Sequence, residues 1–527
     1  MSLVHRLTSR NAVAMVANCI CAATLMAAPS MQSIEESIQR AMKEFQVPGM
    51  AVSVVYDGAS YYSNGHGILE IDTEDPVDDQ TLFQIASVSK AFTAATLAML
   101  VDDGELNWDD PVIDYLPEFR MYDPWVTREF RILDLLTHRS GLPLGAGDLL
   151  LIPEAKSTRE EIITAMRYLK PSSSFRSKYD YDNLLYIIAG EVVGRVAGTS
   201  FEEFLEERLL FPLDMRDCTA AFERTKPRAT KATPHVLLDG NLETTGSLAS
   251  TVAAAAGGVN CSARSMAIWM SFILNKGRNA DGEQLISEAQ VDRLLAPVTL
   301  LTPRGYFTKH AGTFLNAYAL GWNVSTFYGQ PMYSHGGALW GMTTYLAILP
   351  EQGLAVFASN NQMSPAPLAV VNDVLDQFLD GITPQSGQDW ISIIADVLDS
   401  RKKDAETAVA EAAASRVANS RPSLPLDAYV GTYQDPWYGE IHILKGDDGN
   451  LLFQSDRSAP LSGPLEHFQY DTFIARWTDR QLMADAYVSF TLSPEGEIDR
   501  IRMKAVSPST DFSFDFHDLD LVRLPAD

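Results

Sequence analysis

The sequence predicts an α+β protein with a small all-β domain at its C-terminal end. Its 527 residues exceed what one hydrophobic core usually organises, so more than one domain is expected. Predicted strands lie near both ends of the larger, first part and enclose a helix-rich middle, which is typical of a layered α+β fold. We expect a first domain over residues 31–385, a helical connector over 386–422 and a β domain over 423–527.

The first part opens with local patterns that are easy to assign. An amphipathic helix is expected at 33–45 and a strand at 51–56, whose turn Asp57-Gly58 leads into a returning strand. Apolar residues then recur with helical spacing to about residue 290. The helices expected in this middle part are at 133–137, 162–168, 184–196, 201–210 and 266–274.

Strand character returns after the helical middle, at 321–324, 344–349 and 354–359. The Ala-rich, charged stretch 389–419 is expected to be helical, either as a connector or as the last helix of the first domain. A Pro-rich break at 420–425 ends it. The short strands expected beyond this break are at 441–444, 451–453, 473–477, 488–492 and 501–503.

Composition excludes several classes of function. Hydrophobic residues make up 46% and charged residues 21%, as in ordinary globular proteins. The formal net charge of −27 disfavours binding to nucleic acid or to anionic lipid. Cys218 and Cys261 form either one disulfide or two buried thiols, and no His/Cys cluster has metal-ligand spacing. We therefore expect no metal and no other cofactor.

The N-terminal segment 1–30 resembles a bacterial export signal. Arg6 and Arg10 precede an uncharged, Ala-rich stretch at 11–28, and small residues follow at the position of a cleavage site. This pattern predicts a periplasmic or secreted protein, whereas a true start at Met31 would make it cytoplasmic. No later stretch is long and apolar enough to span a bilayer, so the mature chain is not expected to insert into the membrane.

The first candidate for chemistry is the SxxK pair of Ser87 and Lys90. A hydroxyl becomes a good nucleophile when a base takes its proton, and a lysine can be that base if burial lowers its pKa. A spacing of three places both side chains on one face of a helix. The helix is expected to begin at Ser87 and to be buried, because residues 91–100 are nearly all apolar. A lone SxxK is a weak signal, but one that opens an apolar helix is stronger.

Two further motifs supply the other reactive groups. Tyr181 and Asn183 stand just before the helix expected at 184–196; the tyrosine could move protons and the amide could bind the Lys90 ammonium or the substrate. His335 precedes two glycines, and we expect it to offer a hydrogen-bond donor or a partly positive charge. Taken alone, each motif also fits a helix cap or a simple turn.

Backbone groups near these side chains complete the expected site. Glycine at 336 and 337 lets a substrate backbone lie close to the strand. The N–H groups of Ala338 and Ser87 could together bind an oxyanion. His138 is expected to be a structural hydrogen-bonding residue.

The order of these motifs resembles the serine β-lactamase and penicillin-binding-protein superfamily, and most closely its class C β-lactamase-like branch. The motifs are Ser87-Val88-Ser89-Lys90, the stretch 135–142, Tyr181-Asp182-Asn183 and His335-Gly336-Gly337, and the resemblance covers about residues 33–380. It implies an antiparallel sheet flanked by helices, with a helical subdomain. It also implies that Ser87 forms an acyl-enzyme, that Lys90 and Tyr181 act as the acid/base pair, and that the amides of Ser87 and Ala338 bind the oxyanion.

Two departures from the family pattern bear on the substrate. His335 stands where many relatives carry a lysine that binds a substrate carboxylate, which weakens the case for a true β-lactamase and is common among esterases and peptidases. Asp182 replaces the usual small residue. The part after 423 resembles the lipocalin-like barrel of such enzymes, with 427–433 as its opening strand and 467–473 as another typical stretch. In some relatives this domain helps form a homo-oligomer or covers the active site; a purely stabilising domain is the other interpretation.

The resemblance implies a serine hydrolase that cleaves amide bonds of small or linear peptides. Relatives with the same two-part plan include archaeal aminopeptidases and an enzyme that cuts linearised microcystin, so D-residues or unusual residues are expected in the substrate. A carboxylesterase of the same branch is the close alternative, and a cell-wall carboxypeptidase is another. A catalytically inactive binding or sensing protein is the alternative from a different class, against which the intact Ser87, Lys90, Tyr181 and His335 speak. Specificity is expected to come from loops 142–156 and 300–314.

Overall fold

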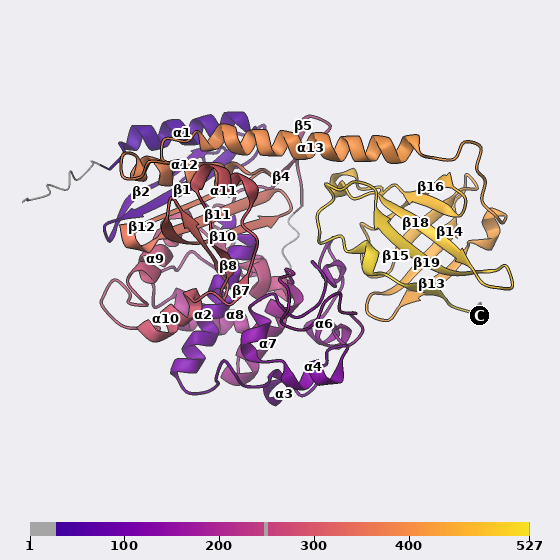
Figure 1. Cartoon of the computed structure of the whole chain (residues 1–527), viewed down its shortest axis with the longest axis horizontal. Coiled ribbons are helices and arrows are strands. Elements are labelled where there is room, and N and C mark those ends of the chain that lie inside the picture. The colour runs from indigo at the N-terminus through magenta and orange to yellow at the C-terminus, as the bar shows by residue number, and fades with distance from the viewer. Residues whose placement is uncertain (1–27, 247–250, 526–527) are drawn as a thin grey trace, which may run out of the picture.

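The computed structural model describes residues 28–246 and 251–525, and its first domain is built on one antiparallel sheet (Figure 1). Eight strands lie in the order β2-β1-β12-β11-β10-β9-β8-β7. The α+β prediction is confirmed. The bounds of these strands are β1 Gly49–Tyr56, β2 Ala59–Gly67, β7 Thr299–Leu300, β8 Asn316–Tyr318, β9 Asn323–Phe327, β10 Gln330–Leu339, β11 Met342–Leu349 and β12 Leu354–Asn360.

Helices cover both faces of this sheet, which explains why its central strands are apolar throughout rather than alternating. Val52 and Val54 of β1 pack in the cluster under α1 (Met31–Glu44) and α12 (Ala366–Leu379). Ala51 and Val55 face the opposite core, where α9 packs against the sheet. The other helices of this domain are α2 Ser89–Asp102, α3 Val112–Tyr115, α4 Pro124–Glu129, α5 Ile132–Leu135, α6 Arg159–Ala165, α7 Leu184–Ala197, α8 Phe201–Leu205, α9 Ala263–Leu274, α10 Glu288–Leu295 and α11 Gly305–Ala311.

Several predicted boundaries differ from the observed ones. The helix expected from Ser87 begins at Ser89, because a single 3₁₀ turn at Ala86–Val88 comes first. The helix expected at 201–210 changes to π-helical turns at Glu206–Leu210. The strand expected from Gly321 begins at Asn323, since Gly321 has a φ of +79° that no extended strand tolerates.

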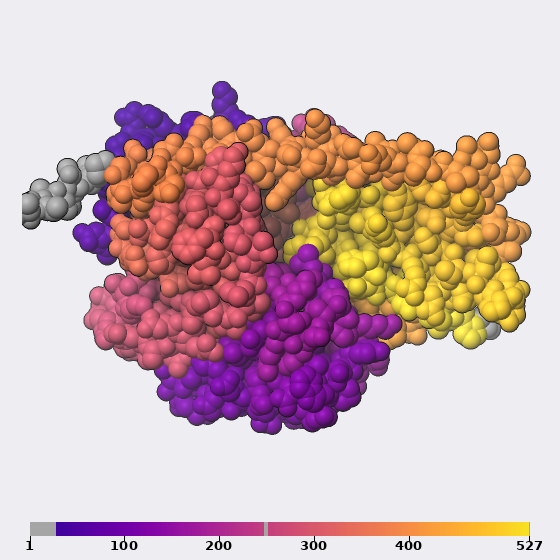
Figure 2. All heavy atoms as spheres, in the orientation of Figure 1, coloured from indigo at the N-terminus to yellow at the C-terminus, as the bar shows by residue number. Residues whose placement is uncertain are grey.

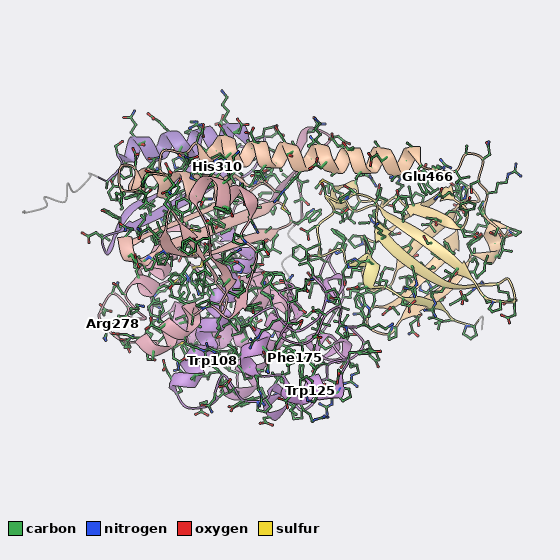
Figure 3. All side chains as sticks on the ribbon, viewed as in Figure 1. Trp108, Trp125, Phe175, Arg278, His310 and Glu466 are labelled. Atoms are coloured by element: carbon green, nitrogen blue, oxygen red, sulfur yellow. A yellow bond between two sulfur atoms is a disulfide. The ribbon has the colours of Figure 1, made fainter. Side chains whose placement is uncertain are left out.

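The helical part below the sheet also has its own aromatic packing. The rings of Trp125 and Phe175 meet edge to face with centroids 6.3 Å apart, and both are seen among the helices of this part in Figure 3. Among the described residues no single helix is long and apolar enough to cross a membrane. One bent helix pair, Leu184–Ala197 with Phe201–Leu210, passes the test of length and composition alone.

The predicted connector is the 25-residue helix α13, Trp390–Ala414, which runs from the first domain to the barrel (Figure 1). Its first turn belongs to the first domain: Trp390 is fully buried and donates a hydrogen bond to Tyr328 Oη at 3.1 Å. Beyond that turn the helix is mostly exposed. Its far end meets the barrel, where Val417 N–H donates to Gln469 Oε1 at 3.0 Å. The segment thus contacts the first domain at its beginning and the barrel just beyond its end.

The C-terminal domain is a closed antiparallel barrel, which confirms the predicted all-β barrel; its eight strands, β13 to β20, follow one another in chain order. The expected opening strand at 427–433 is wrong at its start, because Leu426–Ala428 is a 3₁₀ turn and the strand begins at Gly431. The strands are β13 Gly431–Asp435, β14 Gly439–Lys445, β15 Leu451–Ser455, β16 Ser462–Gln469, β17 Thr472–Ala475, β18 Ala486–Leu492, β19 Ile498–Ala505 and β20 Leu521–Arg523.

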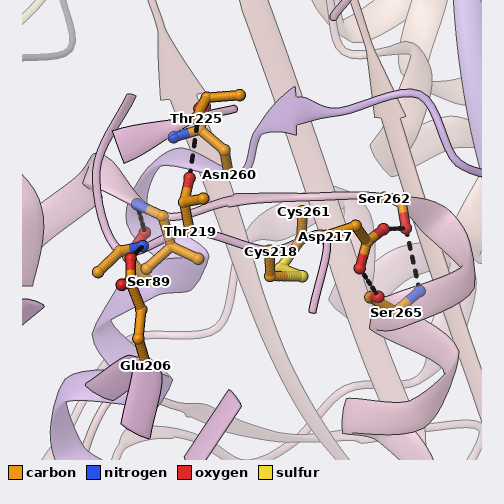
Figure 4. Close-up of a disulfide and its surroundings, with 12 residues drawn as sticks. Ser89, Glu206, Asp217, Cys218, Thr219, Thr225, Asn260, Cys261, Ser262 and Ser265 are labelled. Atoms are coloured by element: carbon orange, nitrogen blue, oxygen red, sulfur yellow. Dashed lines mark hydrogen bonds between the residues drawn. A yellow bond between two sulfur atoms is a disulfide. The ribbon is translucent and has the colours of Figure 1, made fainter. Parts of the chain in front are cut away.

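The open question about the two cysteines is resolved in favour of a disulfide, Cys218–Cys261 (Figure 4). Cys261 lies on the short strand β6 (Asn260–Cys261), opposite Phe83 of β3 (Phe83–Gln84). Since β3 leads directly into the turn that carries Ser87, the disulfide ties the scaffold behind that residue to the turn after the π-helix.

Candidate active site

Ser87 stands at a sharp turn between strand β3 and helix α2. The preceding residue, Ala86, has a φ of +47°, a left-handed conformation that is costly for a residue with a Cβ. The turn leaves Ser87 partly exposed while the twelve residues from Ser89 to Leu100 are buried. A partly exposed serine therefore precedes a buried, apolar helix, in the position where the sequence predicts the nucleophile.

Lys90 lies one turn further along and is completely buried. Its Nζ lies 3.2 Å from Ser87 Oγ, 2.8 Å from Asn183 Oδ1 and 2.7 Å from the Ala256 carbonyl. Burial lowers the pKa of Lys90 to about 7, although the charges of Asp148 and Asp182 oppose the shift. A lysine that is partly neutral near pH 7 and touches a serine hydroxyl can act as a general base.

Tyr181 completes the contact around Ser87. Lys90 Nζ lies 4.8 Å from the centre of the Tyr181 ring. Burial raises the pKa of Tyr181 well above its usual value, and a hydrogen bond with the Ser87 side chain opposes that rise. The phenol is therefore neutral and able to donate or relay a proton. The structure brings Ser87, Lys90, Tyr181 and Asn183 together as the sequence analysis expected.

The strand β10 forms the opposite side of the site. It pairs with β9 only as far as Ser334, while its pairing with β11 continues to Leu339. Beyond Ser334 its free edge faces the Ser87 turn: a Cβ on Gly337 would stand 2.4 Å from the Ile85 carbonyl. The backbone at Gly337 must therefore be bare, and Ala338 follows it in an exposed position.

His335 occupies this edge but is not charged, which corrects one of the two expected roles. Burial and the nearby Lys90 lower the pKa of His335 to about 3. Its Nδ1 lies 2.6 Å from the Gly336 carbonyl, which can only accept, so Nδ1 carries the proton. Its Nε2 then accepts from Tyr318 Oη at 2.9 Å. His335 is a neutral residue next to the Tyr181 ring, whose centroid lies 6.5 Å away.

His138 has the structural role that was expected. Its Nδ1 accepts a hydrogen bond from the Asp182 N–H at 3.1 Å, and its ring stacks near that of Tyr181 with centroids 4.2 Å apart. Burial lowers the pKa of His138 well below its usual value, so it too is neutral. It holds the turn on which Tyr181 stands.

Ser87, Tyr181, Asn183 and His335 line a cavity of about 640 Å³ at the junction of the two domains (Figure 2). Its lining includes residues from both predicted specificity loops, such as Leu144 and Arg304. It also includes Asp511, Phe512 and Ser513, which belong to the barrel and which no sequence motif places at this site. The barrel is thus a wall of the candidate active site.

Arg304 is a cationic side chain in the lining of this cavity. It is exposed to the cavity, and Nη1 lies 3.3 Å from Tyr306 Oη. Within residues 28–246 and 251–525, no carboxylate lies in ion-pair distance of its guanidinium. In a chain with a net charge of −27, a cation left free in a cavity is available to an anionic group of a ligand.

Metal-binding geometry does not coincide with this cavity. In the described part of the chain, the His, Cys, Asp and Glu side chains close enough to share an ion are Glu440, His442 and Asp456 of the barrel. None of the three lines the cavity.

Comparisons with known proteins identify both parts of the chain. The model of the β-lactamase family matches residues 34–380, and that of a domain of unknown function, DUF3471, matches residues 415–523. The unguisins hydrolase of Aspergillus campestris is 27% identical over 89% of this chain and 88% of its own. Penicillin-binding protein 4 of Amycolatopsis lactamdurans is 28% identical over 62% of this chain and 84% of its own.

Solved structures share the whole architecture. The octameric penicillin-binding protein homologue from Pyrococcus abyssi covers 94% of this chain and all of its own, with a TM-score of 0.60 and 19% identity. SurE covers 94% of this chain and 99% of its own, with a TM-score of 0.53 and 21% identity. The motifs, the fold and the match over residues 34–380 agree, and the chain belongs to the β-lactamase family, within the superfamily of serine β-lactamases and penicillin-binding proteins.

Proposed function

We propose that this protein is a serine hydrolase that cleaves amide bonds of small or linear peptides through an acyl-enzyme on Ser87. The observation that carries the proposal is the contact of Ser87 with both Lys90 and Tyr181. Lys90 lies 3.2 Å from the Ser87 hydroxyl and is buried, which favours its neutral, basic form.

The residues divide the proposed reaction between them. The neutral amine of Lys90 accepts the Ser87 proton as Oγ attacks the substrate carbonyl carbon. The N–H groups of Ser87 and Ala338 bind the resulting oxyanion. The C–N bond then breaks and the leaving amine takes a proton that Tyr181 passes on. Water then attacks the ester carbonyl carbon and gives a proton to Lys90. Lys90 returns that proton to Ser87 Oγ as the C–O bond breaks, and the product acid leaves.

Three observations favour peptides as substrates. The cavity of about 640 Å³ has room for several residues. The free guanidinium of Arg304 suits a peptide carboxylate. The similar Aspergillus protein is named for hydrolysis of unguisins, and SurE has been solved with D-Leu, which supports substrates with D-residues or unusual residues such as linearised microcystin.

A carboxylesterase is the second candidate, because an ester needs the same nucleophile and base. The two are separated by kcat/KM on short linear peptides, with L- or D-residues at the cleaved bond, beside p-nitrophenyl esters. We expect peptide cleavage to exceed ester cleavage and the Ser87→Ala protein to lose both by at least about a thousandfold. Fast ester cleavage without peptide cleavage would make the protein an esterase. Turnover that survives in Ser87→Ala would exclude both.

We also propose that the protein is exported and that it self-associates. The disulfide between Cys218 and Cys261 supports an oxidising compartment. The export signal expected at 1–30 falls almost entirely outside the described residues. The octameric assembly of the Pyrococcus homologue supports an oligomer. Cell fractionation and light scattering on the purified protein test these two points.

A further inference from the structure

The segment between β19 and β20 of the barrel reaches into the first domain at the candidate active site. The Phe512 ring meets that of Tyr181 nearly edge-on, with centroids 5.8 Å apart. Ser513 and Asp515 are buried behind it. Both of these polar side chains hydrogen-bond to the loop that contains Asp148.

A continuous line of hydrogen bonds joins the barrel to the lysine. Ser513 Oγ donates to Asp148 Oδ2 at 3.0 Å, and Asn183 Nδ2 donates to the same oxygen at 2.9 Å. Asn183 Oδ1 in turn accepts from Lys90 Nζ at 2.8 Å. Because both amide positions of Asn183 are occupied, Asp148 fixes which face of Asn183 meets Lys90.

Asp515 holds the loop on both sides of Asp148. Its Oδ2 accepts from the Gly147 N–H at 2.7 Å and its Oδ1 from the Leu149 N–H at 2.9 Å. Asp148 and Asp515 are fully buried. Two buried carboxylates at a domain interface would be costly as mere packing, since apolar residues fill such a place more cheaply.

We propose that the C-terminal barrel positions the catalytic base: Ser513 and Asp515 fix Asp148, Asp148 orients Asn183, and Asn183 holds Lys90 against Ser87. The proposal rests on the proposed function, in which Lys90 is that base. In this proposal the C-terminal barrel contributes to catalysis in the β-lactamase-like domain that precedes it. Ser513, Asp515 and Asp148 are positioning residues, because none of them contacts the reacting atoms.

The acceptor oxygen of Asp148, rather than its charge, carries the proposal. An ionised Asp148 raises the pKa of Lys90, but burial raises the pKa of Asp148 itself to about 8, so Asp148 is mostly neutral where Lys90 titrates. The hydroxyl of Ser513 favours the ionised form of Asp148. The other titratable groups close to Lys90 are unchanged by these substitutions: Asp182, His138, His335, Tyr181 and Tyr186.

The first test compares Ser513→Ala with Ser458→Ala in the full-length protein. Ser458 is a matched control, because it is also a buried barrel serine and donates across the interface, to the Pro153 carbonyl at 2.7 Å. The probe is p-nitrophenyl acetate, whose acylation of Ser87 releases nitrophenolate. We expect kcat to fall about tenfold in Ser513→Ala with KM little changed, and both to stay near wild type in Ser458→Ala.

The second test works on Asp148. Asp148→Ala removes the anchor of Asn183 and should lower kcat about a hundredfold. Adding Ser513→Ala to Asp148→Ala should lower kcat no further, because Ser513 acts through Asp148. Asp148→Asn keeps an acceptor for Asn183, so its kcat should stay near the wild-type value and recover what Asp148→Ala loses.

Each outcome decides the proposal. Equal losses of kcat in Ser513→Ala and Ser458→Ala would overturn the proposal and show that the barrel only packs against the first domain. Additive losses in the variant that combines Asp148→Ala and Ser513→Ala would overturn it too. A kcat of Asp148→Asn as low as that of Asp148→Ala would also overturn it, because the retained acceptor would then not matter. Thermal melts identify any variant that loses activity by failing to fold. If Asp148→Ala does not fold, the more conservative Asp148→Asn is used in its place. If Ser87→Ala itself retains turnover, the proposed function fails, which is a distinguishable result.

Discussion

The two domains that enclose the cavity hold their charges differently. Next to Ser87 the first domain buries ionisable groups: Lys90, Asp148 and Asp182 have no solvent-exposed surface. The barrel, outside the segment at 511–515, carries many of its charges in ion pairs at the surface, such as Arg476 with Asp485. Burial is what shifts a pKa and makes a side chain reactive, whereas exposed pairs contribute little to stability.

The difference between the buried and the surface charges shows which groups of this fold can change protonation near neutral pH. Burial raises the pKa of Asp148 to about 8 and that of Asp182 to about 7, and it lowers that of Lys90 to about 7. All three groups therefore change protonation near neutral pH. A surface pair such as Arg476 with Asp485 keeps its charges over that whole range.

The largest expected loss of kcat/KM is that of Lys90→Arg, which tests whether the buried Lys90 must lose a proton. Lys90→Arg keeps a cation in the buried site but removes the ability to lose a proton, because a guanidinium stays charged. We expect kcat/KM to fall at least about a thousandfold, measured on the best peptide or ester of the panel. Substantial activity in this variant would mean that the amine of Lys90 is not the base.

The pH dependence tests the same point without a mutation. The base must be neutral, and the pKa of Lys90 is about 7, so kcat/KM should rise with pH through that value. Below it the rate should fall about tenfold per pH unit, roughly a hundredfold between pH 7 and pH 5. The neutral His335 and Tyr181 titrate outside this range. A flat profile from pH 5 to pH 8 would contradict the assignment.

Neighbouring glycines offer a matched pair on the edge of β10. Gly337→Ala would place a Cβ 2.4 Å from the Ile85 carbonyl and 3.1 Å from the Ser87 nitrogen, so the strand must move off the nucleophile. We expect about a hundredfold loss of kcat. Gly336→Ala meets nothing nearer than a Tyr345 ring atom at 3.4 Å and should retain most activity. Equal effects of the two changes would show that the close approach to Ser87 is unimportant.

The smallest expected effect concerns substrate choice. Arg304→Gln removes the free cation of the cavity, and kcat/KM should fall roughly tenfold for peptides with a free carboxylate. The same peptides with an amidated end serve as the control and should be cleaved equally by both proteins. A loss that is equal for both forms would argue against a carboxylate-binding role.

Much of the first wall could be predicted from the sequence, because its signals are local. The SxxK spacing places Ser87 and Lys90 on one helical face, and the apolar run after them predicts burial. Tyr181 and Asn183 stand in a short motif before an obvious helix. The neutral state of His335 could not be predicted, since it depends on the surrounding burial and on Lys90.

The second wall could not be predicted. Ser513 and Asp148 are 365 positions apart, and neither stands in a motif. Nothing local marks Asp515 as buried, because an aspartate in a loop is usually solvated. The positive φ of Ala86, which delays the helix to Ser89, is likewise set by the packing of the strand and helix it joins.

Helix α13 has a mechanical consequence for the whole molecule. Its 25 residues span about 37 Å, and its first turn is anchored in the first domain. His310 of the first domain strengthens that anchor, because its Nδ1 lies 3.1 Å from Oε1 of Gln388, just before the first residue of α13 (Figure 3). The barrel is therefore attached to the first domain at two places, through helix α13 and through the segment 511–515. Residues 416–423 belong with the barrel, because Val417 and Ser423 hydrogen-bond to it, so withdrawing Phe512 to admit a bulky substrate would require the barrel to swing on the far end of α13. Restricting that swing would slow substrate entry and product release while the chemistry at Ser87 stayed as fast as before.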